Sequence, residues 1–379
     1  MFNLFFNKNF IKKIVVFSLF IINSSCIYPK VTIKSKDIKL LQVEFKDFKN
    51  WENNDYRMSL ISFLNSCKKF ANMPQNRAIG GKIGNMTPAD FRDVCEIGEI
   101  VIGLKDEQIK NYFENWFRPF LVIDKNGNEN GLFTGYYEAS LEASKVMDHE
   151  YKFPIYSKPN NLDSEPYLTR LEIENGALKN KNLEILYAKD EIELFFTHIQ
   201  GSAKVKLKDG GFSRLAYSAK NNQSFKPISE YLLQKQYLQK SEISAQNIKN
   251  WLRSNPDLAN EVMNYNSSYI FFRLSKDEYA IGAQGVELTE ERSLAVDNEF
   301  IPYGLPIWLE TRLQGNEYCG LFVSQDTGSA IKGAIRGDIF FGNGKKAEDK
   351  ASSMSNKGKY FVLLPADLVQ KMTKSRELF

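Results

Sequence analysis

The sequence predicts a mainly β fold with some α-helix, and two patterns carry that prediction. From Ser267 onward, short β-branched or aromatic runs are separated by Gly, Pro, Asn and Asp. Short strands without long helices between them are typical of a closed barrel or a sandwich. A block from about Ser144 to Met263 has its own strands, turns and helices, and we interpret it as an insertion. A chain of 379 residues is long enough for two domains.

The segment before the first strands is mainly helical in pattern. Residues 56–72 (YRMSLISFLNSCKKFAN) place apolar side chains at three- and four-residue intervals, as on one face of a helix. Pro88 and Asp90 begin a second predicted helix, which runs through Val94. Residues 106–117 predict a third. We expect these helices to serve packing and not the site.

After Phe120 the pattern changes to short strands and Gly-rich turns. Residues 131–137 (GLFTGYY) are strand-like, and Gly135 is expected to break the strand where two tyrosines are displayed. In the middle block, we expect the apolar run 192–200 (IELFFTHIQ) to be one of the strands and turns. Residues 228–240 and 245–254 predict helices, the second of which ends before Pro256.

The N-terminus has the pattern of a targeting segment. Three lysines precede the apolar run 14–22, which is too short to span a bilayer as a mature helix. The small residues 23–25 before Cys26 resemble a bacterial lipobox, which implies a signal peptide over residues 1–25 and an acylated Cys26. Because Ile27 replaces the aspartate that often retains such proteins at the inner membrane, this resemblance favours the outer membrane, facing the periplasm. An uncleaved N-terminal anchor is the alternative.

Composition excludes several kinds of chemistry. The formal charge of +4 is weak and dispersed, so nucleic-acid binding is not expected. Cys67, Cys95 and Cys319 form no CxxC pair, which argues against a metal site. One disulfide stays open as an alternative, but the scattered spacing favours buried free thiols. The chain has only two histidines, His149 and His198, which argues against a zinc site or a Ser/His/Asp triad. Carboxylates are therefore the candidate catalytic groups.

Three aspartates stand at the ends of strand-like runs near the C-terminus: Asp297, Asp326 and Asp338. Glycines 328, 333 and 337 allow sharp turns between the last two, so both carboxylates could reach one cleft. Residues 326–329 (DTGS) also match the motif of an aspartic protease. That mechanism needs two close carboxylates, and the chain contains no second motif, so the protease is the least favoured hypothesis.

A wider pattern resembles a known family. The stretches DTGSAIKGAIRGDIFFGNGKKAEDKAS and VDNEFIPYGLPIWLE resemble the three-aspartate domain of the membrane-bound lytic murein transglycosylase A family. FTGYYEAS, PYLTRLEIENGAL, FFTHIQGSAKVKLKDG and YSAKNNQSFKPISEYLL resemble other blocks of that family, in the same order. The resemblance runs from about Leu132 to Pro365.

The resemblance implies a double-psi β-barrel domain with a smaller inserted β-barrel domain, and a substrate groove between them. The resemblance divides the chain into four parts. Residues 1–25 are a lipoprotein signal peptide, and residues 26–142 hold the N-terminal helices and the first part of the large domain. Residues 143–263 are the insertion, and residues 264–379 are the remaining part of the large domain. The implied activity is cleavage of the β-1,4 bond between N-acetylmuramic acid and N-acetylglucosamine, with a 1,6-anhydromuramoyl product. The implied partners are peptidoglycan glycan strands.

The family pattern also assigns roles to the aspartates. Asp338 corresponds to the catalytic acid, and Asp326 to a neighbour that holds the acid and raises its pKa, because two close carboxylates resist ionising together. Asp297 is either a supporting residue or the cap of a turn. Intramolecular attack by the muramoyl C6 hydroxyl replaces the second catalytic carboxylate of a hydrolase. No metal or organic cofactor is expected.

Further residues are carried over as glycan contacts, because aromatic rings cover sugar faces and amides bond N-acetyl groups. They come from the TGYY, IQGS and YSAKNN stretches: Thr134, Tyr136, Tyr137, Gln200, Gly201, Ser202, Tyr217 and Asn222. Each taken alone could instead be a turn or strand residue. A hypothesis from another class, a non-catalytic polysaccharide-binding protein of the expansin-like kind, stays open because fold alone does not settle function.

Overall fold

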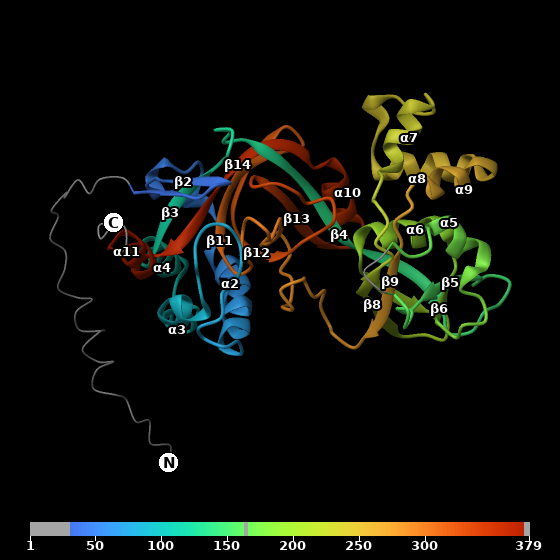
Figure 1. The fold of residues 1–379 in the computed structure, drawn as a ribbon, viewed down its shortest axis with the longest axis horizontal. Helices are drawn as coiled ribbons and strands as arrows, with labels where there is room; N and C mark the ends of the chain where they lie inside the picture. Colours follow the sequence, from blue (N-terminus) through green and yellow to red (C-terminus); the bar gives the residue numbers. More distant parts are fainter. Residues whose placement is uncertain (1–30, 163–165, 375–379) are drawn as a thin grey trace, which may run out of the picture. The chain divides into compact units, whose positions relative to one another are not determined.

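Six strands pair in a closed ring and form a β-barrel (Figure 1). The computed structural model describes residues 31–162 and 166–374. Neighbours in the ring are β4 (Gly131–Ser144), β13 (Arg336–Asn343), β10 (Ser293–Val296), β12 (Asn316–Asp326), β11 (Pro306–Leu313) and β14 (Ser355–Pro365), and β14 pairs back onto β4. The short C-terminal strands predicted a closed barrel or a sandwich, and the structure has the barrel.

Two pairs in the ring are parallel, β13 with β4 and β10 with β12, and the others are antiparallel. Large apolar side chains fill the core, among them Phe133, Leu294, Trp308, Phe341 and Tyr360, all fully buried. Beyond β14 the sheet continues through β3 (Phe117–Asp124), β2 (Ile38–Gln42) and β1 (Thr32–Lys34).

Helices from the N-terminal segment pack on the barrel as expected. They are α2 (Tyr56–Ala71), α3 (Arg92–Val101) and α4 (Asp106–Trp116), with short 3₁₀ turns η2 (Phe45–Asp47), η3 (Trp51–Asn53) and η4 (Pro88–Phe91). The Asp55 side chain accepts a hydrogen bond from the backbone N–H of Met58 and so caps α2. The helix predicted from Pro88 extends further than expected, because η4 leads directly into α3. Two later helices, α10 (Lys345–Ser353) and α11 (Ala366–Lys374), flank β14.

A disulfide joins α2 to α3. Cys67 and Cys95 are bonded, whereas Cys319 is free. The expectation of buried free thiols was wrong for the first two, since the packing of two helices that are distant in sequence brings them together. The bond closes a loop 28 residues long.

The second sheet shares β4 with the barrel. Its order is β5 (Phe153–Tyr156), β6 (Glu184–Ala188), β4, β7 (Ala203–Leu207), β8 (Phe212–Lys220) and β9 (Ile270–Ser275), and the outer strands β5 and β9 contact each other. Residues 131–138 of β4 pair within the barrel, and residues 139–144 pair with β6 and β7. Gly135 does not break this strand. A Cβ there would lie 2.4 Å from the Phe341 ring, so the glycine permits a close approach.

Helical elements of the inserted segment are α5 (Arg170–Glu172), η5 (Ile173–Ala177), α6 (Glu191–Gln200), α7 (Ile228–Gln234), η6 (Lys240–Glu242), α8 (Ala245–Ser254) and α9 (Pro256–Asn264). The run 192–200, expected among strands and turns, is helix α6: Asp190 caps it, and five consecutive residues, 194–198, are buried. Helix α8 matches its predicted bounds. Helix α7 ends earlier than predicted, before Gln236, whose φ of 59° is left-handed.

The described residues include no helix that could cross a membrane. The predicted signal peptide and Cys26 lie outside the described residues.

Candidate active site

Strand register places the two aspartates of the candidate pair on either side of one small residue. Ala295 of β10 pairs with Asp326 of β12 and with Asp338 of β13. Asp338 also pairs with Thr134 of β4. Residues directly opposite each other in a sheet point to the same face. Asp326, Ala295, Asp338 and Thr134 therefore form one row across four strands, which we call the aspartate row.

Asp338 accepts one strong side-chain hydrogen bond. The Thr134 Oγ1 hydroxyl donates to Asp338 Oδ1 at 2.5 Å, and Arg336 Nη2 donates to the same Thr134 oxygen at 2.9 Å. Burial raises the pKa of Asp338 to about 6, against the opposing effects of the Thr134 bond and the Arg336 charge. The charge of Asp326 adds to the rise, but it is the smallest of these causes. The predicted rise is therefore present, with burial as its main source.

Asp326 is held by three donors. The Tyr136 hydroxyl donates to Oδ2 at 2.7 Å, and the backbone N–H groups of Ala283 and Thr327 each donate to Oδ1 at 2.9 Å. Burial raises the pKa of Asp326, while all three hydrogen bonds favour its ionised form. The pKa of Tyr136 is also raised, mainly by burial and then by the charge of Asp326. Asp326 thus fixes Tyr136 and the 283 loop beside the aspartate row.

Asp297 has a different role from the other two aspartates. Its side chain is only 2% exposed and accepts hydrogen bonds from the backbone N–H groups of Glu299 and Gly333, at 3.2 and 2.8 Å. Lys332 Nζ lies 3.7 Å from Oδ1 of Asp297, the oxygen that also accepts from Glu299. Asp297 therefore caps one turn and ties the chain between Asp326 and Asp338 to it, which agrees with the turn-cap alternative.

The two adjacent tyrosines separate onto opposite faces of β4, because side chains alternate along a strand. Tyr136 faces the aspartate row. Tyr137 is 5% exposed, and its hydroxyl donates to Glu348 Oε1 at 3.0 Å. We therefore correct the expectation that the Tyr137 ring covers a sugar, since this residue is buried within the protein.

The remaining predicted glycan contacts gather where β4 passes between the sheets. Gln200 Oε1 accepts from the backbone N–H of Tyr137 at 3.2 Å, and Gly201, with φ of 80°, ends α6. Ser202 is half-buried in the turn that follows. Tyr217 is 51% exposed. Leu215 of β8 pairs with Ala203 of β7, and the strands are antiparallel, so Tyr217, two residues further along β8, lies next to this turn.

Asn222 lies after β8, in left-handed backbone with φ of 57°. It thus follows the strand that carries Tyr217, and its backbone conformation is one that asparagine tolerates better than most residues.

Sequence reasoning missed two residues of the site. Arg336 was not given a role, although its guanidinium bonds Thr134 and its charge lowers the pKa of Asp338. Ala295 was not singled out at all. The alternation along β13 could have indicated that Arg336 and Asp338 share a face, but no signal in the sequence places Ala295 between two aspartates.

Comparisons with known proteins place this geometry in a family. Residues 132–273 match the model of the MltA specific insert domain, and residues 292–364 match the model of the 3D domain. A membrane-bound lytic murein transglycosylase A from Vibrio cholerae is 31% identical over 249 residues, which are 63% of this chain and 66% of that protein. A homolog of the same protein from Buchnera aphidicola is 28% identical over 371 residues, covering 94% of this chain and 96% of its own.

Solved structures agree. A membrane-bound lytic murein transglycosylase from Agrobacterium tumefaciens is 30% identical with a TM-score of 0.76, and the match covers 87% of this chain and 98% of that one. MltA from Neisseria gonorrhoeae is 30% identical with a TM-score of 0.74, over 89% and 96% of the two chains. These matches place the chain in the class of lytic murein transglycosylases. The chain belongs to the membrane-bound lytic murein transglycosylase A family.

Proposed function

We propose that this chain cleaves the β-1,4 bond between N-acetylmuramic acid and N-acetylglucosamine in peptidoglycan and leaves a 1,6-anhydromuramoyl end, with Asp338 as the single acid and base. The observation that carries the proposal is the environment of Asp338. Burial raises its pKa to about 6, so a useful fraction is protonated near neutral pH. Family membership supplies the substrate class.

The first step is proton donation. The protonated Asp338 gives its proton to the glycosidic oxygen, so that the bond from that oxygen to muramoyl C1 breaks and the N-acetylglucosamine hydroxyl leaves. The Thr134 hydroxyl holds Oδ1 in place during this transfer, because it bonds that atom at 2.5 Å. The bond strengthens when Asp338 becomes a carboxylate, and this stabilises the charge that the step creates.

The second step closes the anhydro ring. The muramoyl C6 hydroxyl attacks C1, and the Asp338 carboxylate removes the hydroxyl proton, which returns the enzyme to its starting state. Intramolecular attack can reach effective molarities of about 10⁵ M or more. A second carboxylate to activate water is therefore unnecessary, and Asp326, held by three donors, serves as a positioning residue.

Sugar contacts follow from the same geometry. Tyr136 stands beside the aspartate row, and the exposed Tyr217 ring with the Gln200–Ser202 turn lies further along β4. We place the glycan strand along this path, with Thr134 at the cleaved bond and Asn222 as a further polar contact. The division into a large domain and an insertion over residues 143–263 belongs to the same proposal, with the glycan in the groove between them.

A lipid anchor is part of the proposal. Cys26 follows a signal peptide pattern, and the related proteins are named membrane-bound. Acylation of Cys26 would hold the enzyme at the outer membrane, facing the periplasmic murein. Incorporation of labelled palmitate into the wild type, and its loss in Cys26→Ala, would be expected.

Digestion of murein sacculi tests the activity. The wild type is expected to release muropeptides that are lighter by one water than hydrolysis products, as seen by mass spectrometry, and Asp338→Asn is expected to release none. Reducing ends would indicate a hydrolase instead, cut peptides a protease, and binding without release a polysaccharide-binding protein. An active Asp338→Asn variant would refute the assignment of the acid.

A further inference from the structure

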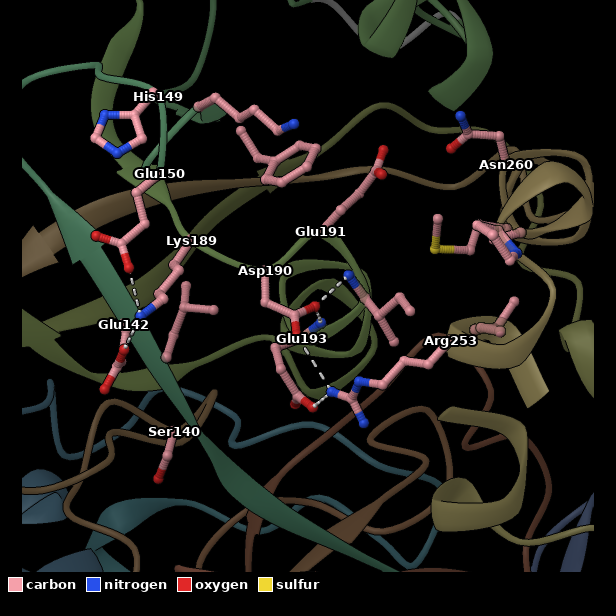
Figure 2. Close-up of a pocket in the computed structure, with 18 residues that line it drawn as sticks. Ser140, Glu142, His149, Glu150, Lys189, Asp190, Glu191, Glu193, Arg253 and Asn260 are labelled. Carbon is pink, nitrogen blue, oxygen red and sulfur yellow. Dashed lines mark hydrogen bonds and ion pairs between the residues drawn. The ribbon is translucent and has the colours of Figure 1, made fainter. Parts of the chain in front are cut away.

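A cavity lies on the second sheet, apart from the aspartate row. Its volume is about 800 Å³, and residues of β4, β5, α6, α8 and α9 line it (Figure 2). Apolar side chains contribute to the lining, among them Leu141, Phe153 and Ile192. Glu142 in the lining stands eight residues beyond Thr134 on β4, which is roughly 26 Å along a strand that rises about 3.3 Å per residue.

Most charges around this cavity are already paired. Lys189 lies 2.7 Å from Glu150 and 3.4 Å from Glu142. Arg253 lies 2.5 and 3.3 Å from two carboxylates at the start of α6, those of Glu193 and Asp190. Each of these four carboxylates therefore has a cation within 4 Å, so none of them lacks a partner.

Two opposite charges are left over. Within the described residues, neither the carboxylate of Glu191 nor the ammonium of Lys152 has a hydrogen bond or ion pair. Lys152 Nζ contacts the Phe153 ring at 5.3 Å. In Figure 2 the Glu191 carboxylate points into the cavity, away from the Arg253 ion pairs. Burial raises the pKa of Glu191, and the charge of Lys152 opposes this only in part, so a closer cation would stabilise the carboxylate.

We infer that this cavity binds the zwitterionic end of a diamino-acid residue in a murein stem peptide, with the ammonium at Glu191 and the carboxylate at Lys152. A group that carries both charges on one carbon satisfies both side chains at once. A neutral sugar satisfies neither, and a simple cation leaves Lys152 unpaired. The aliphatic part of the diamino acid would lie against Phe153. The choice of murein as the source of the ligand rests on the proposed function.

The distance from the aspartates determines which peptide can bind. Three residues span at most about 11 Å when fully extended, which is shorter than the path along β4. The bound stem would therefore belong to a muramoyl unit other than the one being cut, or to a neighbouring strand. The cavity would then strengthen binding of peptide-bearing murein and leave the chemical step unchanged.

Calorimetric titration of the full chain with two synthetic peptides tests this. One is the stem tripeptide ending in diaminopimelate, and the other ends in lysine, which lacks the side-chain carboxylate. Glu191→Gln should weaken binding of both about tenfold or more, because a hydrogen-bonded charge is lost. Lys152→Met should weaken only the diaminopimelate peptide. The exposed controls Glu230→Gln and Lys181→Met should bind both peptides like the wild type.

Three results would overturn the inference: no binding of the diaminopimelate peptide to the wild type, unchanged binding in Glu191→Gln, or an equal effect of Lys152→Met on both peptides. Turnover adds an independent readout. On peptide-free glycan, Glu191→Gln should match the wild type, whereas on intact sacculi its KM should rise with kcat unchanged. Absence of anhydro products with peptide binding retained would refute the proposed function alone.

Discussion

Asp338→Asn is expected to make the folded protein more stable at pH 7. The pKa of Asp338 is about 6 in the folded protein, against an ordinary value of 3.8, so the folded chain binds this proton more tightly than the unfolded chain. The contribution of Asp338 to stability is therefore complete below pH 3.8 and is lost as pH rises through 6. A rise of about two pH units corresponds to at most about 3 kcal/mol. Asparagine stays uncharged and avoids this loss, while its Oδ1 can still accept the Thr134 hydrogen bond.

Urea unfolding of wild type and variant between pH 4 and pH 8 measures this difference. The gap in the free energy of unfolding should open between pH 4 and 6 and stay constant above pH 7. A variant that is less stable at pH 7, or a gap that is the same at every pH, would refute the view that burial of a charge raises the pKa of Asp338.

Three more outcomes follow from the contacts. Thr134→Val removes the hydrogen bond that favours ionised Asp338, so the pH at which activity falls should rise by about one unit. Thr134→Ser keeps the hydroxyl and should leave that pH unchanged. A shift to lower pH in Thr134→Val would contradict the reasoning. Reduction of the Cys67–Cys95 disulfide should lower the free energy of unfolding by about 3–4 kcal/mol, because the bond closes a loop 28 residues long. Replacing both cysteines by serine should have the same effect, measured by urea unfolding. Lys249→Met removes a buried ammonium that bonds Glu193 and Glu348 at 2.7 Å each. It should lower the free energy of unfolding by about 3 kcal/mol, which an unchanged urea midpoint would disprove.

The aspartates could be found from the sequence, but their arrangement could not. Asp326 ends one strand-like run and Asp338 begins the next, and the glycines between them indicated two strand-end carboxylates. The pairing that puts both beside Ala295 depends on β10 lying between β12 and β13. Strand order in a mixed barrel follows from packing of the whole chain, and no local pattern encodes it.

Alternation could have separated the two tyrosines in advance. Neighbouring residues of a strand face opposite sides, so Tyr136 and Tyr137 cannot both line one site. The resemblance to the family carried both over together, and this obscured the physical constraint.

Helix α6 was misassigned for a physical reason. Five consecutive residues, 194–198, are buried. Burial therefore does not follow the helical period there, and the apolar pattern distinguishes neither helix nor strand. The signal that remained was Asp190 before the run, whose side chain bonds the N–H groups of Ile192 and Glu193. The disulfide left no comparable signal, because it depends on how two separate helices pack.

The parallel pairing of β4 with β13 has a consequence for folding. The hydrogen bond from Thr134 to Asp338 joins residues 204 positions apart, and closing a flexible loop of that length costs about 5 kcal/mol of chain entropy. The second sheet lies within this loop, and its prior formation would shorten the effective length to be closed. We therefore expect the two halves of the active site to meet late in folding, after the second sheet has formed.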